Sequence, residues 1–227
     1  MKHIPWKTAL GTALSVGLIA APLAAVPAFA VEASPAAAGS SPVIINEAYL
    51  SGGSAGAAFK NKFVELYNTS DAPVSLDGWS LQYRSASGTG VPGDVVPLTG
   101  SIAAKSFYLV KATGNNPTTS TAPEVPAFDL DAGNKFAPSG TTGTIVLAKQ
   151  TTAVNPLATG SVVESANVAD LLGYGASNTF ETRVATAPAN NADVKSFNRS
   201  NGVDSNNNFA DFTLNATITP RAPNGSA

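Results

Sequence analysis

Hydrophobic and polar positions alternate most clearly over residues 61–84. The part from 63 to 67 has the period of two that is expected for a pleated strand. Turn-forming residues follow over 68–73, where Asn, Ser and Asp side chains can bond the nearby backbone and Pro fixes φ. Over 79–84, Trp, Leu and Tyr occupy one face while Ser, Gln and Arg occupy the other. The stretch therefore predicts a hairpin of two antiparallel strands, with the second strand buried on one face only.

Further short strands are predicted along the rest of the chain. They are rich in β-branched and aromatic residues and are separated by segments rich in Gly, Ser, Thr, Pro and Asn. The predicted strands are residues 43–50, 95–98, 106–111, 144–148, 168–174 and 194–197, followed by the segment 208–212. No window after residue 30 has a sustained helical period of 3.6. Many short strands bounded by turn signals favour an all-β sandwich or barrel.

The first thirty residues have the pattern of a secretory signal peptide. Basic residues precede an apolar run, and Ala28-Phe29-Ala30 places small residues at the two positions that a signal peptidase reads. A transmembrane helix is the alternative interpretation, but Pro interrupts the run, which falls short of the ~20 apolar residues that span a bilayer. We expect cleavage near Ala30, release outside the cytoplasm, and a flexible leader over 31–41. No later segment is long and apolar enough to span a membrane.

Composition narrows the chemistry once residues 1–30 are set aside. The chain has no Cys, and its one His lies in that segment, so Ser-His-Asp and Cys-His mechanisms and His-ligated zinc are excluded from the remainder. Lys2 and Lys7 also lie there, so 15 Asp and Glu stand against 11 Lys and Arg (13 − 2) in the remainder, a formal net charge of −4. Without disulfides, the fold depends on buried apolar surface. We predict one all-β domain over 42–215 and a disordered tail over 216–227.

Three motifs in sequence resemble the lamin-tail domain as it occurs in secreted bacterial proteins. They are Val43-Ile44-Ile45-Asn46-Glu47, then Phe63-Val64-Glu65-Leu66-Tyr67-Asn68, then Val74-Ser75-Leu76-Asp77-Gly78-Trp79-Ser80-Leu81. Segments 107–110, 145–147, 170–175, 196–199 and 204–212 continue the likeness, which covers roughly residues 42–220. The resemblance implies an immunoglobulin-like β-sandwich with long polar loops, a module that binds or targets rather than catalyses. We expect it to act without an attached hydrolase domain.

Glu47 and Glu65 lie in strands that are predicted to be neighbours. Two carboxylates held close together can share a proton, bind a metal or carry out acid–base chemistry. They can also accept hydrogen bonds from backbone N–H groups and fix the ends of the hairpin. Because neither a nucleophile nor a partner base accompanies the pair, we prefer the structural role and predict no catalytic site.

Oxygen-bearing side chains recur at alternate positions in the segment that begins at residue 204, as they do in loops that wrap calcium. The residues are Asp204, Asn206, Asn208 and Asp211. The segment is not an EF-hand, because it lacks the Gly at the sixth position and the Glu at the twelfth. Asn-rich segments also form ordinary turns, and we prefer that interpretation. If a cation binds here, these four residues and backbone carbonyls are the expected ligands, with Ca²⁺ as the expected ion.

The sequence thus predicts a secreted, non-catalytic binding or scaffolding module whose partner is an extracellular protein or a component of the cell envelope. The alternative is an accessory module for extracellular nucleic-acid or phosphoester degradation, working beside a separate enzyme. Such a role requires clustered basic residues. The available residues are Lys60, Lys62, Arg84, Arg183 and Arg199, which are scattered in an acidic chain. We therefore do not expect nucleic acid to be the partner.

Overall fold

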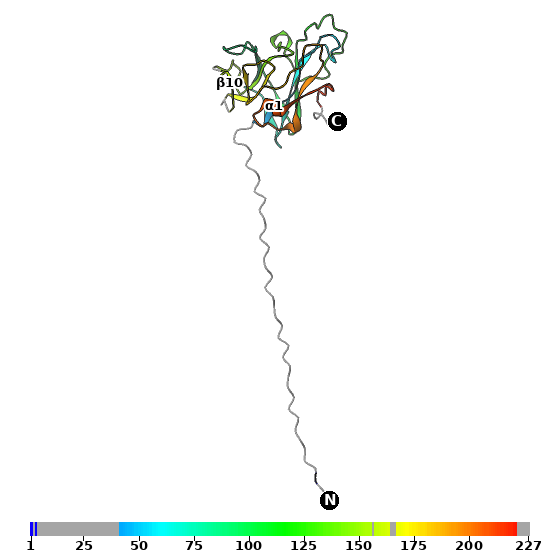
Figure 1. The fold of residues 1–227 in the computed structure, drawn as a ribbon, viewed down its shortest axis with the longest axis vertical. Coiled ribbons are helices and arrows are strands. Elements are labelled where there is room, and N and C mark those ends of the chain that lie inside the picture. Colours follow the sequence, from blue (N-terminus) through cyan, green and yellow to red (C-terminus); the bar gives the residue numbers. More distant parts are fainter. Residues whose placement is uncertain (2, 4–40, 156, 164–166, 222–227) are drawn as a thin grey trace. The chain divides into compact units, whose positions relative to one another are not determined.

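The computed structural model describes residues 1, 3, 41–155, 157–163 and 167–221. Almost all of the predicted signal peptide and of the predicted leader lies outside this part of the chain, as do residues 222–227 of the predicted tail. The described residues form strands joined by loops, with one short α-helix, α1 (Asn208–Asp211), labelled in Figure 1. Two 3-10 turns accompany it, η1 (Gly133–Lys135) and η2 (Ser200–Gly202).

Two sheets account for most of the strands. The larger has the order β14 (Phe212–Asn215), β13 (Ser196–Arg199), β1 (Val43–Tyr49), β2 (Lys62–Asn68), β7 (Phe107–Ala112) and β8 (Leu130–Asp131). The smaller has the order β11 (Val168–Tyr174), β9 (Gly143–Ala148), β4 (Ser80–Arg84) and β5 (Asp94–Pro97). Two further pairs join β3 (Val74–Ser75) to β6 (Ser101–Ile102) and β10 (Gly160–Ser161) to β12 (Thr179–Phe180).

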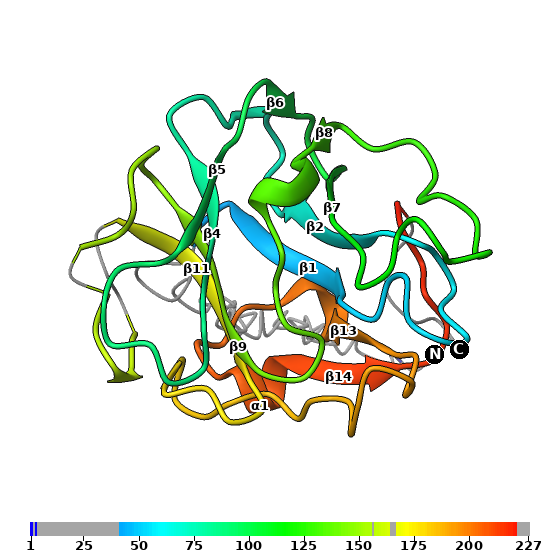
Figure 2. The ribbon, with the colours of Figure 1, turned by 90° about the horizontal axis from the view of Figure 1, so that it is seen from above.

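The two sheets pack face to face around one main core. Residues of both sheets alternate into this core, as the period of two requires. From the larger sheet come Val64, Leu66 and Val110, and from the smaller come Leu81, Ile145, Leu147 and Leu172, all fully buried. Figure 2 shows β4, β9 and β11 of one sheet alongside β1, β2 and β13 of the other. The all-β sandwich expected from the strand pattern is therefore confirmed.

The predicted hairpin over 61–84 is wrong, although both of its strands exist. β2 pairs with β1 and β7, whereas β4 belongs to the other sheet and pairs with β5 and β9. The turn residues between them, including β3, carry the chain from one sheet to the other. The polar face of β4 is also buried, because the segment after β9 covers it. Gln82, for example, donates to the carbonyl of Thr152 and accepts from the N–H of Val154.

The outer face of the larger sheet is covered as well. Tyr49, Phe63 and Leu109 form a small cluster there with Val125, and the rings of Tyr49 and Phe63 are 5.6 Å apart. Ile218, close to the end of the described chain, packs against this cluster. Residues 218–221, which the sequence assigns to the tail, thus contact the sheet. Among the residues that the structure describes, no helix is long and apolar enough to cross a bilayer.

Candidate functional site

Asp170 lies in β11, where the otherwise apolar strand faces β1 of the other sheet. The pairing of β11 with β9 is irregular between Val168 and Asp170, which changes the side-chain direction at this point. The carboxylate accepts hydrogen bonds from the backbone N–H of Ile45 at 2.6 Å and of Leu171 at 2.8 Å. Because Ile45 belongs to β1, Asp170 ties the two sheets together.

Arg199, the last residue of β13, provides the positive charge next to Asp170. Its side chain is fully buried, and one guanidinium nitrogen is 2.6 Å from Asp170 Oδ2. A second nitrogen lies 3.2 Å from Asp211 Oδ2 and 3.4 Å from Asp204 Oδ1. Nε donates to the carbonyl of Ile45 at 2.7 Å. One guanidinium therefore contacts three carboxylates, one from β11 and two from the segment 204–211.

The segment from Asp204 to Asp211 folds around this guanidinium. Asp204 Oδ1 accepts from the N–H of Asn206, which has a positive φ of 55° that Asn tolerates better than most residues. Asp211 accepts from the N–H and hydroxyl of Ser205 and from the N–H of Asn207. The carboxylates thus organise the loop by binding its own backbone and Arg199.

Asn208 fixes the loop to the edge of β11. Its Oδ1 accepts from the N–H of Gly173 at 2.8 Å and of Glu181 at 3.0 Å. Its Nδ2 donates to the carbonyl of Leu171 at 2.6 Å and to Glu181 Oε2 at 2.8 Å. The amide therefore satisfies two backbone groups of β11 that a neighbouring strand would otherwise bond. The side chain is fully buried, so these bonds are shielded from water.

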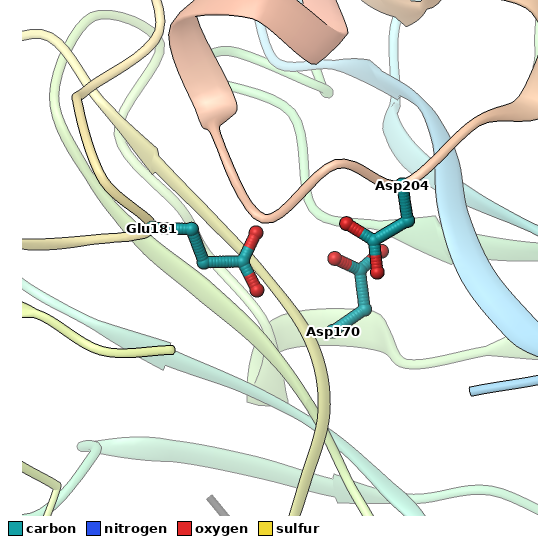
Figure 3. Close-up of side chains that lie close together, drawn as sticks. All are labelled: Asp170, Glu181 and Asp204. Atoms are coloured by element: carbon teal, nitrogen blue, oxygen red, sulfur yellow. The ribbon is translucent and has the colours of Figure 1, made fainter. Parts of the chain in front are cut away.

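Three carboxyl groups point into the same space in Figure 3. One oxygen each of Asp170, Glu181 and Asp204 lies within 4.8 Å of the others, and this group is the candidate metal centre. Burial, together with the negative charges of Asp170 and Asp204, raises the pKa of Glu181 to about 10. Burial also raises the pKa of Asp170 to about 6, although Arg199 opposes this rise. At neutral pH, Glu181 is therefore protonated and Asp170 is ionised.

Only part of the predicted calcium set meets at this place. Asp204 belongs to the group of three carboxyls, whereas Asn208 and Asp211 are engaged with the backbone, and Asn206 contributes its carbonyl to a bond with Thr182. Calcium binding by Asp204, Asn206, Asn208 and Asp211 stays a prediction. Asp170 and Glu181 were not predicted, because they precede this loop by many residues and no local spacing joins them to it.

The arrangement suits structure and cation binding better than catalysis. All-oxygen groups are the ligands that hard cations such as Ca²⁺ prefer, so Asp170, Glu181 and Asp204 could hold one if Glu181 lost its proton. Arg199 already supplies one positive charge here, however. Acid–base catalysis needs groups that reach a substrate, and Asp170 and Glu181 are 1% and 4% exposed.

The basic residues considered for nucleic-acid binding do not form a surface patch. Lys62, Arg84 and Arg199 are 4%, 2% and 0% exposed. Lys62 donates to the carbonyl of Pro138, and burial lowers its pKa to about 8. Lys60 pairs with Glu124 at 2.6 Å. Phosphate contacts need exposed cations, so of these five residues only Arg183 is left unburied and outside an ion pair among the described residues.

Comparison with known protein families identifies a match for most of the sandwich. A family profile described as Lamin Tail Domain matches residues 36–176, well over half of the chain. This range includes Glu47, Glu65 and Asp170 but ends before Glu181 and the loop that contains Asp204. None of the curated proteins compared with the chain matches it.

Proposed function

Because the chain belongs to the lamin tail domain family, an immunoglobulin-like and generally non-catalytic family, we propose that it is a secreted module that binds a protein partner. The observation that carries this proposal is the two-sided character of the loop from Val203 to Asp211. One side of the loop is buried in the ionic cluster, and the other presents apolar side chains to solvent.

Phe209 and Val203 are the apolar side chains on the outer side. They are 43% and 56% exposed. The guanidinium carbon of Arg183 lies 3.7 Å from the centre of the Phe209 ring, and the N–H of Phe209 donates to the carbonyl of Arg183 at 3.0 Å. The ring and the cation are therefore held together on the surface.

A loop of this kind is suited to recognition. Binding residues are often carried on loops that a rigid scaffold positions, and fixing a loop before binding lowers the entropic cost of association. Aromatic and Arg side chains supply much of the binding energy at protein interfaces. The buried bonds of Asp211 and Asn208 provide the rigidity, and Phe209 with Arg183 provides the contact surface.

The test compares two exposed Phe residues that each have a basic side chain over the ring. Phe128 is 40% exposed and has Lys111 over its ring at 4.2 Å, so Phe128→Ala is a matched control for Phe209→Ala. The purified protein is immobilised and exposed to secreted proteins and envelope fractions of the producing cells. Proteins retained by the wild type are identified and their affinities measured.

Loss of Phe209 should weaken this binding by roughly tenfold or more, as expected for an interface anchor. Loss of Phe128 should leave it within about twofold. Equal effects of the two substitutions, or retention of DNA in place of protein, would contradict the proposal. Hydrolysis of DNA or phosphoesters by the wild type at a rate that follows the protein would contradict its non-catalytic character.

A further inference from the structure

A second group of buried carboxylates lies on the outer face of the larger sheet, away from the Arg199 cluster. Glu47 in β1 is directly opposite Glu65 in β2, and Asn198 in β13 is opposite Glu47 on its other side. Side chains that are opposite each other in antiparallel strands share one face, with Cβ atoms about 5 Å apart. Glu47 and Glu65 are fully buried and Asn198 is 3% exposed. The three side chains therefore form a row of oxygen-bearing groups shielded from water.

The C-terminal segment closes this row. Thr219 donates to Glu47 through its N–H at 3.3 Å and its hydroxyl at 3.2 Å, which are long bonds. The N–H of Arg221 donates to Glu65 Oε2, and Asn46 Nδ2 donates to Glu65 Oε1 at 2.9 Å. These donors are neutral groups. The charge of Arg221 lowers the pKa of Glu65, but its guanidinium forms its ion pair with Asp129 rather than with either Glu.

Asn198 adds an acceptor that has no donor. Its Nδ2 bonds the hydroxyl and carbonyl of Ser196, at 2.7 and 3.2 Å. Its Oδ1 is buried and has no hydrogen-bond partner among the described residues. Asn198 is directly opposite Glu47 in the strand register, so this unsatisfied oxygen belongs to a residue beside the pair on the same sheet face. A buried acceptor without a donor costs free energy unless a ligand satisfies it.

Within the described part of the chain, no Lys or Arg forms an ion pair with either Glu. The guanidinium of Arg221, the nearest candidate by sequence to the closing segment, bonds Asp129 and the carbonyl of Ala127. Buried carboxylates are normally neutralised by a proton, a basic side chain or a metal ion. Burial, helped by the charge of Glu47, raises the pKa of Glu65 to about 7, and burial also raises the pKa of Glu47.

We propose that Glu47, Glu65 and Asn198 form a binding site for a hard divalent cation of the calcium type, closed by Thr219 and Arg221. The site offers two carboxylates and a neutral amide oxygen, which is the donor chemistry that Ca²⁺ selects. The ion would balance the two buried charges and satisfy Asn198 Oδ1 at once. This inference is independent of the proposed binding surface at Phe209.

The test is calcium binding by the purified protein at pH 7.5, measured by calorimetry and by thermal unfolding with calcium or a chelator. Calcium at about 100 times its dissociation constant should raise the unfolding temperature by roughly 5–10 °C. Glu65→Gln removes one carboxylate and should abolish both signals. Glu124→Gln is the control, because it changes an exposed carboxyl that pairs with Lys60 outside both carboxyl groups, and it should leave both signals unchanged.

Asn198→Asp gives a second test that does not depend on losing a ligand. It adds a carboxylate to the row, so it should strengthen calcium binding by about tenfold while lowering the unfolding temperature in chelator. A site that takes only a proton would show no calcium signal in the wild type, and that result would overturn the proposal. Calcium signals that survive in Glu65→Gln, or that disappear in Glu124→Gln, would also overturn it.

Discussion

The sandwich contains two buried groups of carboxylates that differ in how their charge is balanced. In the group around Arg199, one guanidinium contacts Asp170, Asp204 and Asp211 at 2.6–3.4 Å. In the group on the outer sheet face, Glu47 and Glu65 face each other and receive only neutral donors from the segments around them. Both groups are closed by C-terminal parts of the chain, the first by the loop 204–211 and the second by residues 219–221.

This difference separates a group that carries its own cation from one that must acquire a proton or an ion. The Arg199 group is organised by bonds within the chain, so its loop can be rigid in the absence of any ligand. The Glu47–Glu65 pair depends on pH and on ions in solution, because two ionised carboxylates in a dry site repel each other. The C-terminal segment that covers the pair should share this dependence.

The largest expected effect comes from removing the internal cation. Arg199→Met leaves three carboxylates buried or nearly buried without their partner, which should lower the free energy of unfolding by about 3–5 kcal/mol. Arg84→Met is the matched control, because Arg84 is also buried but bonds carbonyls, such as those of Leu157 and Ala158, rather than carboxylates. Its cost should be smaller, about 2 kcal/mol. Urea unfolding measures both, and equal losses would contradict the role given to Arg199.

A smaller loss is expected when the loop is released from β11. Asn208→Ala leaves the N–H groups of Gly173 and Glu181 without their acceptor, which should cost about 2–3 kcal/mol. Asn206→Gly is the control: it preserves the positive φ of the same loop and should change the stability by less than about 0.5 kcal/mol. If Asn206→Gly proves as destabilising as Asn208→Ala, the anchoring role of Asn208 is wrong.

Local patterns in the sequence predict the strands but not their sheets. Predicted strands at 43–50, 106–111, 144–148 and 168–174 are present, because alternation and β-branched residues act over a few neighbours. The predicted pairing of β2 with β4 was wrong, because contacts with strands distant in the sequence decide which sheet a strand joins. The immunoglobulin-like fold was predicted instead from motifs such as Phe63–Asn68, and the family match confirms this prediction.

The candidate site was only partly predictable for the same reason. Asp204 was singled out by the spacing of oxygen-bearing residues around it. Asp170 and Arg199 could have been identified by a different feature of the sequence, because each is a charged residue in or beside an apolar strand. A charged side chain that is buried in a core needs an opposite charge nearby. That argument can identify candidates for a buried pair, but it cannot say which two residues meet.

The pH dependence of stability in chelator tests the difference between the two groups most directly. The pKa of Glu65 is raised to about 7 in the folded protein, above its ordinary value, so its contribution to stability is present at acidic pH and lost as the pH rises through 7. Glu65→Gln lacks this titration and also removes the repulsion between Glu65 and Glu47, while the Arg199 group is the same in both proteins. We expect the wild type to lose on the order of 2 kcal/mol more than the variant between pH 5 and 8. Parallel curves for the two proteins would show that the charge of the Glu47–Glu65 pair is already balanced, which would contradict the account.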